Sequence, residues 1–405
     1  MAVIDQTIPY SADDPSTLTQ FDAVIDQYLT YSTTTMSTLE QIQSQDPNFV
    51  MGHVFRGYQL KSASDPRFLG AIDQSLSAAR AAGGTAREQQ HIEALAAWRH
   101  DDTRTVTAIL DQILVNDPSD LIALKAANHL HFYRGDVARM RDSVARSLPH
   151  FPQDHPWRSF VLGMLSFGHE ECGDYSDALA CGEAAVAAEP MDMWAAHAVG
   201  HVHEMQKNHS AGIEWLEQCD RHWDQTNNFR NHLIWHKALM FIGQNRLSEA
   251  LHLYDQELTD CLSDDFYLDV CNAASLLWRL EMKGIDVGDR WFALTDFQHR
   301  TTDQELLFIA LHYLMVQART TGKAADPALI APFELWSVGS MEQAKLCQRI
   351  GTDLASGIIH IASEEPAVGV HYLQKALPEL QSLGGSHAQR ALFTDFIQHY
   401  AKENP

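Results

Sequence analysis

The chain has 405 residues, of which 45% are hydrophobic and 20% are charged, so it has ample material for a folded core. Its formal charge of -24 argues against nucleic acid or an anionic membrane surface as a broad partner. No segment approaches the roughly 18 continuous apolar residues of a membrane span, and no signal peptide is evident. The six cysteines form no CxxC pair, which is typical of reduced thiols, and we expect a cytoplasmic protein.

Apolar residues recur at intervals of three and four along the chain, and strand patterns are almost absent. Helical segments alternate with short breaks that contain Gly, Pro, Asp or Asn. The segment from Gly173 to Pro190, GDYSDALACGEAAVAAEP, matches the second half of a tetratricopeptide (TPR) repeat. This pattern predicts pairs of helices joined by tight turns.

One position of that repeat recurs at intervals of 34 or 38 residues, and 34 is the TPR period. The residues at this position are Val106, Met140, Ala178, Gly212 and Ala250. We therefore predict an all-α fold, a TPR-like α-solenoid in which a superhelix of antiparallel helix pairs surrounds a central concave cavity. One solenoid is expected to span 1–405, with the clearest repeats at about 88–260, more divergent repeats at 261–383 and a capping helix at 386–402.

Histidines four residues apart mark two of the predicted inner helices. His197 and His201 form one pair, and His232 and His236 form the other. Four residues are about one helical turn, so each pair projects from one face of its helix. Together with Glu204 they form a candidate acid–base cluster, because imidazole titrates near neutral pH. Any single inward histidine can equally be a core residue with satisfied hydrogen bonds.

The same imidazoles are candidate metal ligands, because positions i and i+4 of a helix are a known ligand spacing. If a metal is bound, the predicted ligands are His197, His201, His232 and His236, and Zn or Fe is the expected ion. The segment from His197 to His201 lacks the glutamate of the HExxH protease motif, so that mechanism is not supported. We see no GxSxG elbow, Walker loop or dinucleotide fingerprint in the sequence.

Further polar residues on the predicted inner surface are candidates for ligand contacts. Lys125 and His129 take inward positions of one repeat, and a polar line crosses the otherwise apolar helix at 269–279. This line can instead be a buried Asp–Arg network that braces neighbouring repeats. The motif GGSHAQR predicts a helix amino terminus that attracts anions, although an ordinary N-cap explains its serine as well. The predicted ligand-binding residues are His53, Lys125, Asn128, His129, Asp269, Asn272, Ser275, Arg279, Ser386, His387 and Arg390.

Several segments together resemble the tetratricopeptide-repeat protein 38 family, which includes the StaR-like bacterial proteins. These segments are HIEALAAW, DLIALKAANHLHFYRGD, MRDSVARSLP, HAVGHVHEM, NHLIWHKAL, SLLWRL and GGSHAQR, and the likeness runs from about His53 to Phe393. The resemblance implies a TPR-like all-α fold and supports the positions of these motifs rather than a particular reaction.

These features favour a protein that binds a small polar or anionic molecule, or a peptide, in a histidine-rich concave cavity. The first alternative is an enzyme that uses the same His, Glu, Asp and Arg side chains for acid–base or metal-assisted chemistry. The second alternative is a scaffold that recruits other proteins through its outer surface.

Overall fold

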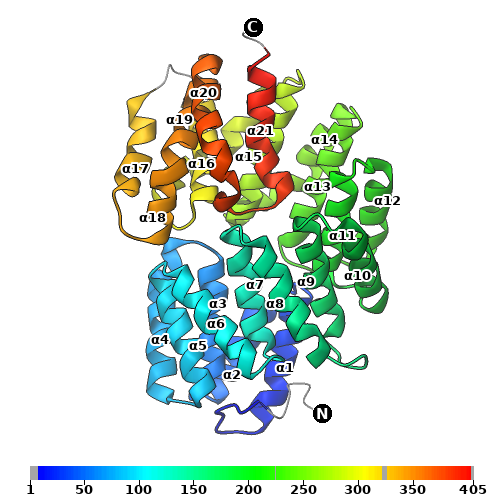
Figure 1. Ribbon diagram of the computed structural model, residues 1–405, viewed down its shortest axis with the longest axis vertical. Coiled ribbons are helices and arrows are strands. Elements are labelled where there is room, and N and C mark those ends of the chain that lie inside the picture. The colour runs from blue at the N-terminus through cyan, green and yellow to red at the C-terminus, as the bar shows by residue number, and fades with distance from the viewer. Residues whose placement is uncertain (1–7, 224, 322–325, 403–405) are drawn as a thin grey trace. The chain divides into compact units, whose positions relative to one another are not determined.

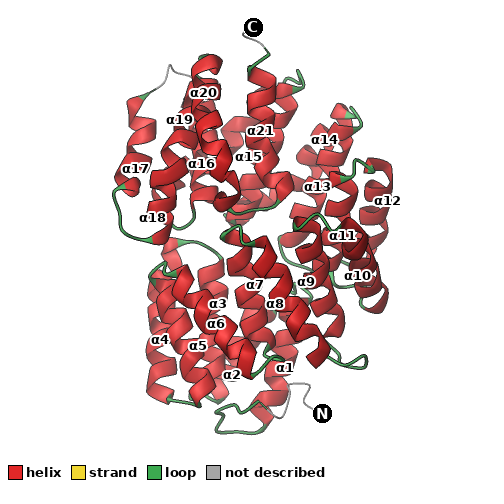
Figure 2. Ribbon diagram, in the orientation of Figure 1, coloured by secondary structure: helices red, strands yellow, loops and turns green. Residues whose placement is uncertain are grey.

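The structure is a computed structural model that describes residues 8–223, 225–321 and 326–402. Within these ranges the chain forms α-helices and no β-strand, so the all-α prediction is confirmed (Figure 1). Figure 2 shows that short loops connect most of the helices. None of the helices in the described part of the chain combines the length and the apolar character that crossing a membrane requires.

The residue contacts divide the chain into two compact units. Residues 8–132, 136–202 and 214–230 belong to the first unit, and residues 133–135, 203–213 and 231–402 belong to the second, within the described ranges. The helices up to residue 219 are α1 (Ser16–Leu29), α2 (Thr35–Gln45), α3 (Val50–Ser62), α4 (Leu69–Ala82), α5 (Ala86–Arg99), α6 (Thr103–Asn116), α7 (Leu121–Tyr133), α8 (Val137–Ser147), α9 (Arg158–Glu171), α10 (Tyr175–Ala188), α11 (Met193–Met205) and α12 (His209–Cys219).

The second unit contains most of the later helices. They are α13 (Phe229–Gly243), α14 (Leu247–Leu253), α15 (Tyr267–Met282), α16 (Leu307–Thr321), α17 (Pro327–Ser337), α18 (Glu342–Leu346), α19 (Thr352–Ala362), α20 (Pro366–Ala376) and α21 (His387–Tyr400). Two π-helical turns, Tyr254–Leu258 and Cys347–Gly351, extend α14 and α18, and the 3-10 segment Gly288–Thr302 precedes α16.

One type of turn recurs before every second helix from α6 to α14. A residue with left-handed backbone is followed directly by the residue that precedes the helix, as in Gly173 (φ 82°) and Asp174 before α10. The left-handed residues of the other four turns are Asp101, Gly135, Lys207 and Asn245. A left-handed residue ends the preceding helix and allows hydrogen bonds to its last free carbonyl groups. An aspartate such as Asp102 or Asp136 then caps the amino terminus of the next helix. The turn thus reverses the chain at the same point of each helix pair.

The five positions of the predicted small-residue site lie on α6, α8, α10, α12 and α14, the second helices of these pairs. All five are buried. At Gly212, a Cβ atom would lie 2.7 Å from the sulfur of Met240, so the neighbouring helix approaches closely. The five positions are therefore buried, as the spacing predicts, and at Gly212 the helices pack closely.

The helices α7 and α11 each begin at a buried aspartate. Asp120 Oδ1 accepts a hydrogen bond from the Ala123 amide at 3.0 Å before α7, and Asp192 Oδ1 accepts one from the Ala195 amide at 2.9 Å before α11. The aspartate stabilises the helix start by satisfying an amide that has no partner within the helix. Both helices carry candidate site residues, so these caps also fix the start of each functional segment.

Candidate functional site

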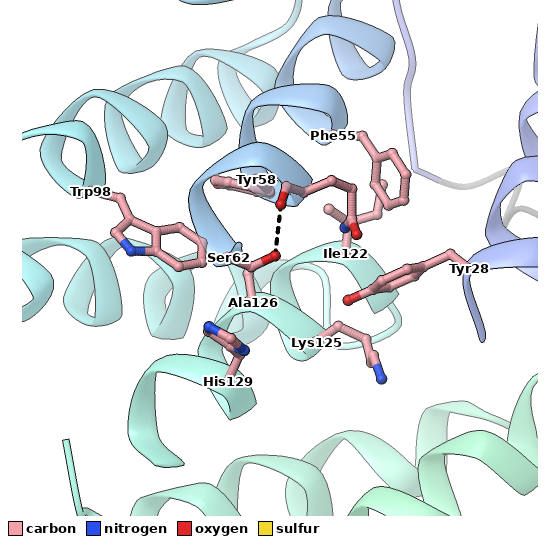
Figure 3. A pocket seen from close by; sticks show the side chains of 10 residues that line it. Tyr28, Phe55, Tyr58, Ser62, Trp98, Ile122, Lys125, Ala126 and His129 are labelled. Atoms are coloured by element: carbon pink, nitrogen blue, oxygen red, sulfur yellow. Dashed lines mark hydrogen bonds between the residues drawn. The ribbon is translucent and has the colours of Figure 1, made fainter. Parts of the chain in front are cut away.

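A small cavity in the first unit lies among α1, α3, α5 and α7 (Figure 3). Its volume is about 50 Å³, which gives room for a few water-sized groups. The residues that line it are Tyr28, Phe55, Tyr58, Gln59, Ser62, Trp98, Ile122, Lys125, Ala126 and His129. Its walls therefore combine aromatic rings with one ammonium group and one imidazole.

Lys125 is half-buried, and aromatic rings surround its ammonium group. Its Nζ lies 5.3 Å from the ring centroid of Tyr28, 6.0 Å from that of Tyr31 and 5.7 Å from that of Trp194. Cation–π attraction stabilises an ammonium at such distances. Burial lowers the pKa of Lys125 to about 8, and the charge of Asp192 opposes this shift. At neutral pH Lys125 is therefore mainly charged, although its proton is held less firmly than usual.

The pKa values of Asp192 and His129, which interact electrostatically with Lys125, are shifted as well. Burial raises the pKa of Asp192 to about 7, although the Ala195 amide and the charge of Lys125 act in the opposite direction. Burial, followed by the charge of Lys125, lowers the pKa of His129 to about 4. His129 is therefore neutral at physiological pH and offers one hydrogen-bond donor and one acceptor.

A chain of hydrogen bonds begins at the cavity wall. The Tyr58 hydroxyl lies 3.1 Å from His91 Nδ1, and His91 Nε2 lies 2.9 Å from Asp120 Oδ2. Arg87 Nη1 donates to the same carboxylate oxygen at 2.5 Å. Burial acts to raise the pKa of Asp120, but the charges of Arg87 and His91 outweigh it and hold that pKa well below its usual range. Because the carboxylate accepts, His91 carries a proton on Nε2, and the Tyr58 hydroxyl also donates to the backbone carbonyl oxygen of His91 at 3.2 Å.

His197 and His201 project from α11 within the first unit. Their ring centroids are 4.4 Å apart, and the ring of Phe167 lies 5.3 Å from His197 and 5.4 Å from His201. His201 Nδ1 is 3.7 Å from Glu170 Oε2 of α9. One oxygen each of Glu170 and Glu171 and one nitrogen of His201 all lie within 4.8 Å of one another. The structure thus adds two carboxylates to this histidine pair.

His232 and His236 project from α13 and belong to the second unit, as does Glu204. His236 Nδ1 lies 2.7 Å from Glu204 Oε2, and His232 Nδ1 lies 3.0 Å from Asn272 Oδ1. Burial raises the pKa of Glu204 to about 7, against the charge of Arg279. Burial and the charge of Arg279 lower the pKa of His236 to about 3. Near pH 7 the Glu204 side chain is therefore present in both its protonated and its ionised form, whereas the His236 imidazole is neutral.

The predicted set of four histidines divides between the units. His197 and His201 lie in the first unit, and His232 and His236 lie in the second. Within its own unit each pair has an acidic neighbour, which is Glu170 for the first pair and Glu204 for the second.

The polar line on α15 forms hydrogen bonds with neighbouring helices of the second unit. Asp269 accepts from Asn231 and Ser275 accepts from Trp235, both on α13. Arg279 donates from Nη2 to a backbone carbonyl of α21 at 2.8 Å. These hydrogen bonds connect α15 to α13 and α21, as expected for the structural alternative to ligand binding.

Two other predicted ligand-binding residues form local hydrogen bonds. The ring nitrogens of His53 lie 3.1 Å from the side chain of Gln43 and 2.8 Å from the carbonyl oxygen of Pro47. The Asn128 side chain donates to the carbonyl oxygen of Met140 at 3.5 Å, which is a long hydrogen bond. Of the predicted set, only Lys125 and His129 line the cavity described above.

The predicted helix start at GGSHAQR is the amino terminus of α21. Ser386 caps it in a capping box, in which its hydroxyl accepts from the Gln389 amide and Gln389 accepts from the Ser386 amide. Arg390 donates to the carbonyl oxygen of Gly385, and His387 is half-buried beside the cap. The N-cap interpretation therefore accounts for the serine.

Sequence reasoning did not select the aromatic walls of the cavity or the acids Glu170, Glu171 and Asp192. The aromatic residues come from three helices, α1, α3 and α5, so no local spacing connects them. For Asp192 a signal exists, because the segments DPSD (117–120) and EPMD (189–192) share an acidic residue, a proline and a buried aspartate. No known protein-family model matches the chain.

Proposed function

We propose that the protein binds a small molecule with a carboxylate or phosphate group and that Lys125 pairs with this anion. The observation that carries the proposal is the half-buried ammonium of Lys125 in the wall of an aromatic-lined cavity. A hydrogen bond between charged groups contributes about 1.5–3 kcal/mol when it is shielded from water. Neutral His129 adds a donor, and the rings of Tyr28 and Trp98 offer apolar surface for the rest of the ligand.

The size of the cavity favours a small molecule over a peptide. About 50 Å³ accommodates a carboxylate or phosphate head and a small apolar group, but not a peptide chain. We further propose that the helix pairs form a TPR-like solenoid of the kind expected for the tetratricopeptide-repeat protein 38 family, in the cytoplasm. The recurring turn and the buried small-residue positions support the solenoid, and the scattered free cysteines support the location.

The experiment replaces Lys125 with methionine, which keeps the apolar stem and removes the charge. Calorimetric titration with benzoate and with inorganic phosphate should show binding to the wild type that weakens about tenfold or more in Lys125→Met. Binding to the wild type should also weaken above about pH 8, where Lys125 loses its proton. Lys345→Met, at an exposed lysine of α18, is the control and should bind as the wild type does. Equal binding of both probes by Lys125→Met and the wild type would contradict the proposal.

A second candidate function is acid–base catalysis in the second unit. The observation that favours it is the 2.7 Å contact between Glu204 Oε2 and His236 Nδ1, with the pKa of Glu204 near 7. A carboxyl group with that pKa can both donate and accept a proton at neutral pH. His232 lies beside this pair, with its ring centroid 4.7 Å from that of His236.

Hydrolysis of p-nitrophenyl acetate provides a probe of this second function. If Glu204 acts as acid or base, the pH–rate profile of the wild type has an inflection near pH 7. Glu204→Gln should lose this inflection and most of the rate, whereas Glu217→Gln, an exposed acid on α12, should keep both. A profile that is unchanged in Glu204→Gln would exclude this candidate.

A further inference from the structure

We propose that Glu170, Glu171 and His201 form a binding site for a divalent transition-metal ion in the first unit. The two acids occupy the last turn of α9, and the histidine lies on α11. Their exposed fractions are 0% for Glu170, 3% for Glu171 and 0% for His201. One ligand atom from each of the three side chains lies within 4.8 Å of the other two. Three metal-binding groups from two helices thus meet at one buried point.

The separation of the groups suits a shared ion better than a direct bond. His201 Nδ1 and Glu170 Oε2 are 3.7 Å apart, beyond the usual range of a hydrogen bond. Two ligand atoms that each lie about 2.1 Å from one ion can be separated by up to about 4.2 Å. The contact to Glu170 already satisfies this limit, and the ligand atom of Glu171 lies within 4.8 Å of the other two.

The electrostatics of the site favour a cation. Glu170 and Glu171 are adjacent carboxylates at the carboxyl end of α9, where the helix dipole is negative. Burial increases the repulsion between the two charges, because water no longer screens them. The pKa of the half-buried Tyr175 is raised by burial and by the negative charges of Glu170 and Glu171. A divalent ion neutralises both carboxylates at once.

The identity of the donor atoms indicates the class of metal. Two carboxylates and one imidazole match Mn²⁺, Fe²⁺ or Zn²⁺ better than the all-oxygen preference of Mg²⁺ and Ca²⁺. The rings of Phe167 and His197 lie 5.4 Å and 4.4 Å from the ring of His201, so they form a tight aromatic wall on one side. Three protein ligands leave a coordination position for water or for a substrate atom.

The test uses the full chain without a histidine tag, stripped with a chelator and titrated with Zn²⁺, Mn²⁺ and Mg²⁺. The wild type should bind one Zn²⁺ or Mn²⁺ ion per chain and bind Mg²⁺ much more weakly. Glu170→Gln and Glu171→Gln keep the side-chain shape and should each weaken binding by about tenfold or more. The matched control is Glu183→Gln, an exposed acid on α10, which should bind as the wild type does.

Crystals of the wild type grown with Zn²⁺ provide an outcome that does not depend on any variant. An anomalous peak between Glu170, Glu171 and His201 is expected, and a peak elsewhere or no peak overturns the proposal. Unchanged affinity in both glutamine variants overturns it as well. Lys125→Met should bind Zn²⁺ normally, so a failure of this site and a failure of the anion pocket can be told apart.

Discussion

Desolvation controls the protonation of several single side chains in this protein. Burial brings the pKa values of Asp192 and Glu204 up to about 7 and that of Lys125 down to about 8. In water, carboxyl groups titrate near pH 4 and lysine above pH 10. Burial disfavours the charged form in each case, which moves acids and bases toward the same pH. Single residues thereby become able to exchange protons under physiological conditions.

Asp120 shows the opposite behaviour, because it has a buried cationic partner. Asp120→Asn leaves Arg87 charged in the interior, and we expect it to lower the free energy of unfolding by about 3–5 kcal/mol at pH 7. Urea-induced unfolding followed by circular dichroism measures this change. Since the native pKa of Asp120 lies below its unfolded value, its contribution is present above about pH 4 and is lost as the pH falls further. The difference between the variant and the wild type should therefore shrink in acid.

The control for this prediction is Asp73→Asn. Asp73 pairs with Arg99 at 2.9 Å, but the Asp73 side chain is 54% exposed. Solvent screening limits such pairs to less than about 1 kcal/mol. Equal destabilisation by the two substitutions would show that the Asp120 network does not stabilise the fold through its burial.

At the scale of helices, glycines permit the closest contact between α19 and α20. A Cβ atom at Gly369 would lie 2.8 Å from the carbonyl oxygen of Gly357 and 3.0 Å from the amide nitrogen of Ile361. Both neighbours are backbone atoms, which cannot rotate away as a side chain can. The pair therefore requires a residue without Cβ at this crossing.

We expect Gly369→Ala to destabilise the protein by about 1–3 kcal/mol, because the added methyl group forces the two helices apart. The control is Gly70→Ala on α4, where a Cβ atom would meet no atom of the described residues within 4 Å. Alanine has the higher helix propensity, so this control should be neutral or more stable by up to about 1 kcal/mol. Thermal unfolding of both variants provides the comparison, and a Gly369→Ala protein as stable as the control would refute the close-contact argument.

For the molecule as a whole, the buried histidines and the buried acids have opposite effects on the pH dependence of stability. The pKa values of His129 and His312 are lowered to about 4 and that of His236 to about 3, each mainly by burial. Unfolding restores a histidine pKa near 6.5, so this stability is present above about pH 6.5 and is lost as the pH falls toward 4. The raised pKa values of Asp192 and Glu204 act the other way, and their contribution is lost as the pH rises from about 4 through 7.

We predict lower stability at pH 5 than at pH 7, because the shifted histidines outnumber the shifted acids. His232 also destabilises the folded protein in acid, since burial holds its pKa well below the usual value. Urea midpoints at the two pH values measure the difference. His312→Gln should reduce this difference, whereas His150→Gln, at an exposed position, should leave it unchanged. A higher midpoint at pH 5 would mean that Asp192 and Glu204 dominate instead.

Local patterns in the sequence predicted the features that depend on neighbours along the chain. The spacing of Ala178 and its counterparts identified the packed face of every second helix, because a helix repeats its faces every turn. The same logic identified Ser386 as a possible N-cap. It also placed Lys125 and His129 on one face of one helix, where they line the same cavity.

Contacts between residues far apart in sequence were decided only when the helices packed. Glu170 lies beside His201, and Tyr58 lies beside His91. The two residues of each pair belong to different helices, and their separation along the chain does not indicate how close they are in space. The two histidine pairs share one sequence pattern, and only the folded chain shows that Glu170 lies beside the first pair and Glu204 beside the second. Helix periodicity is a short-range property that the sequence records directly. The pKa shifts arise from burial and from charges on other helices, so they exist only in the folded chain.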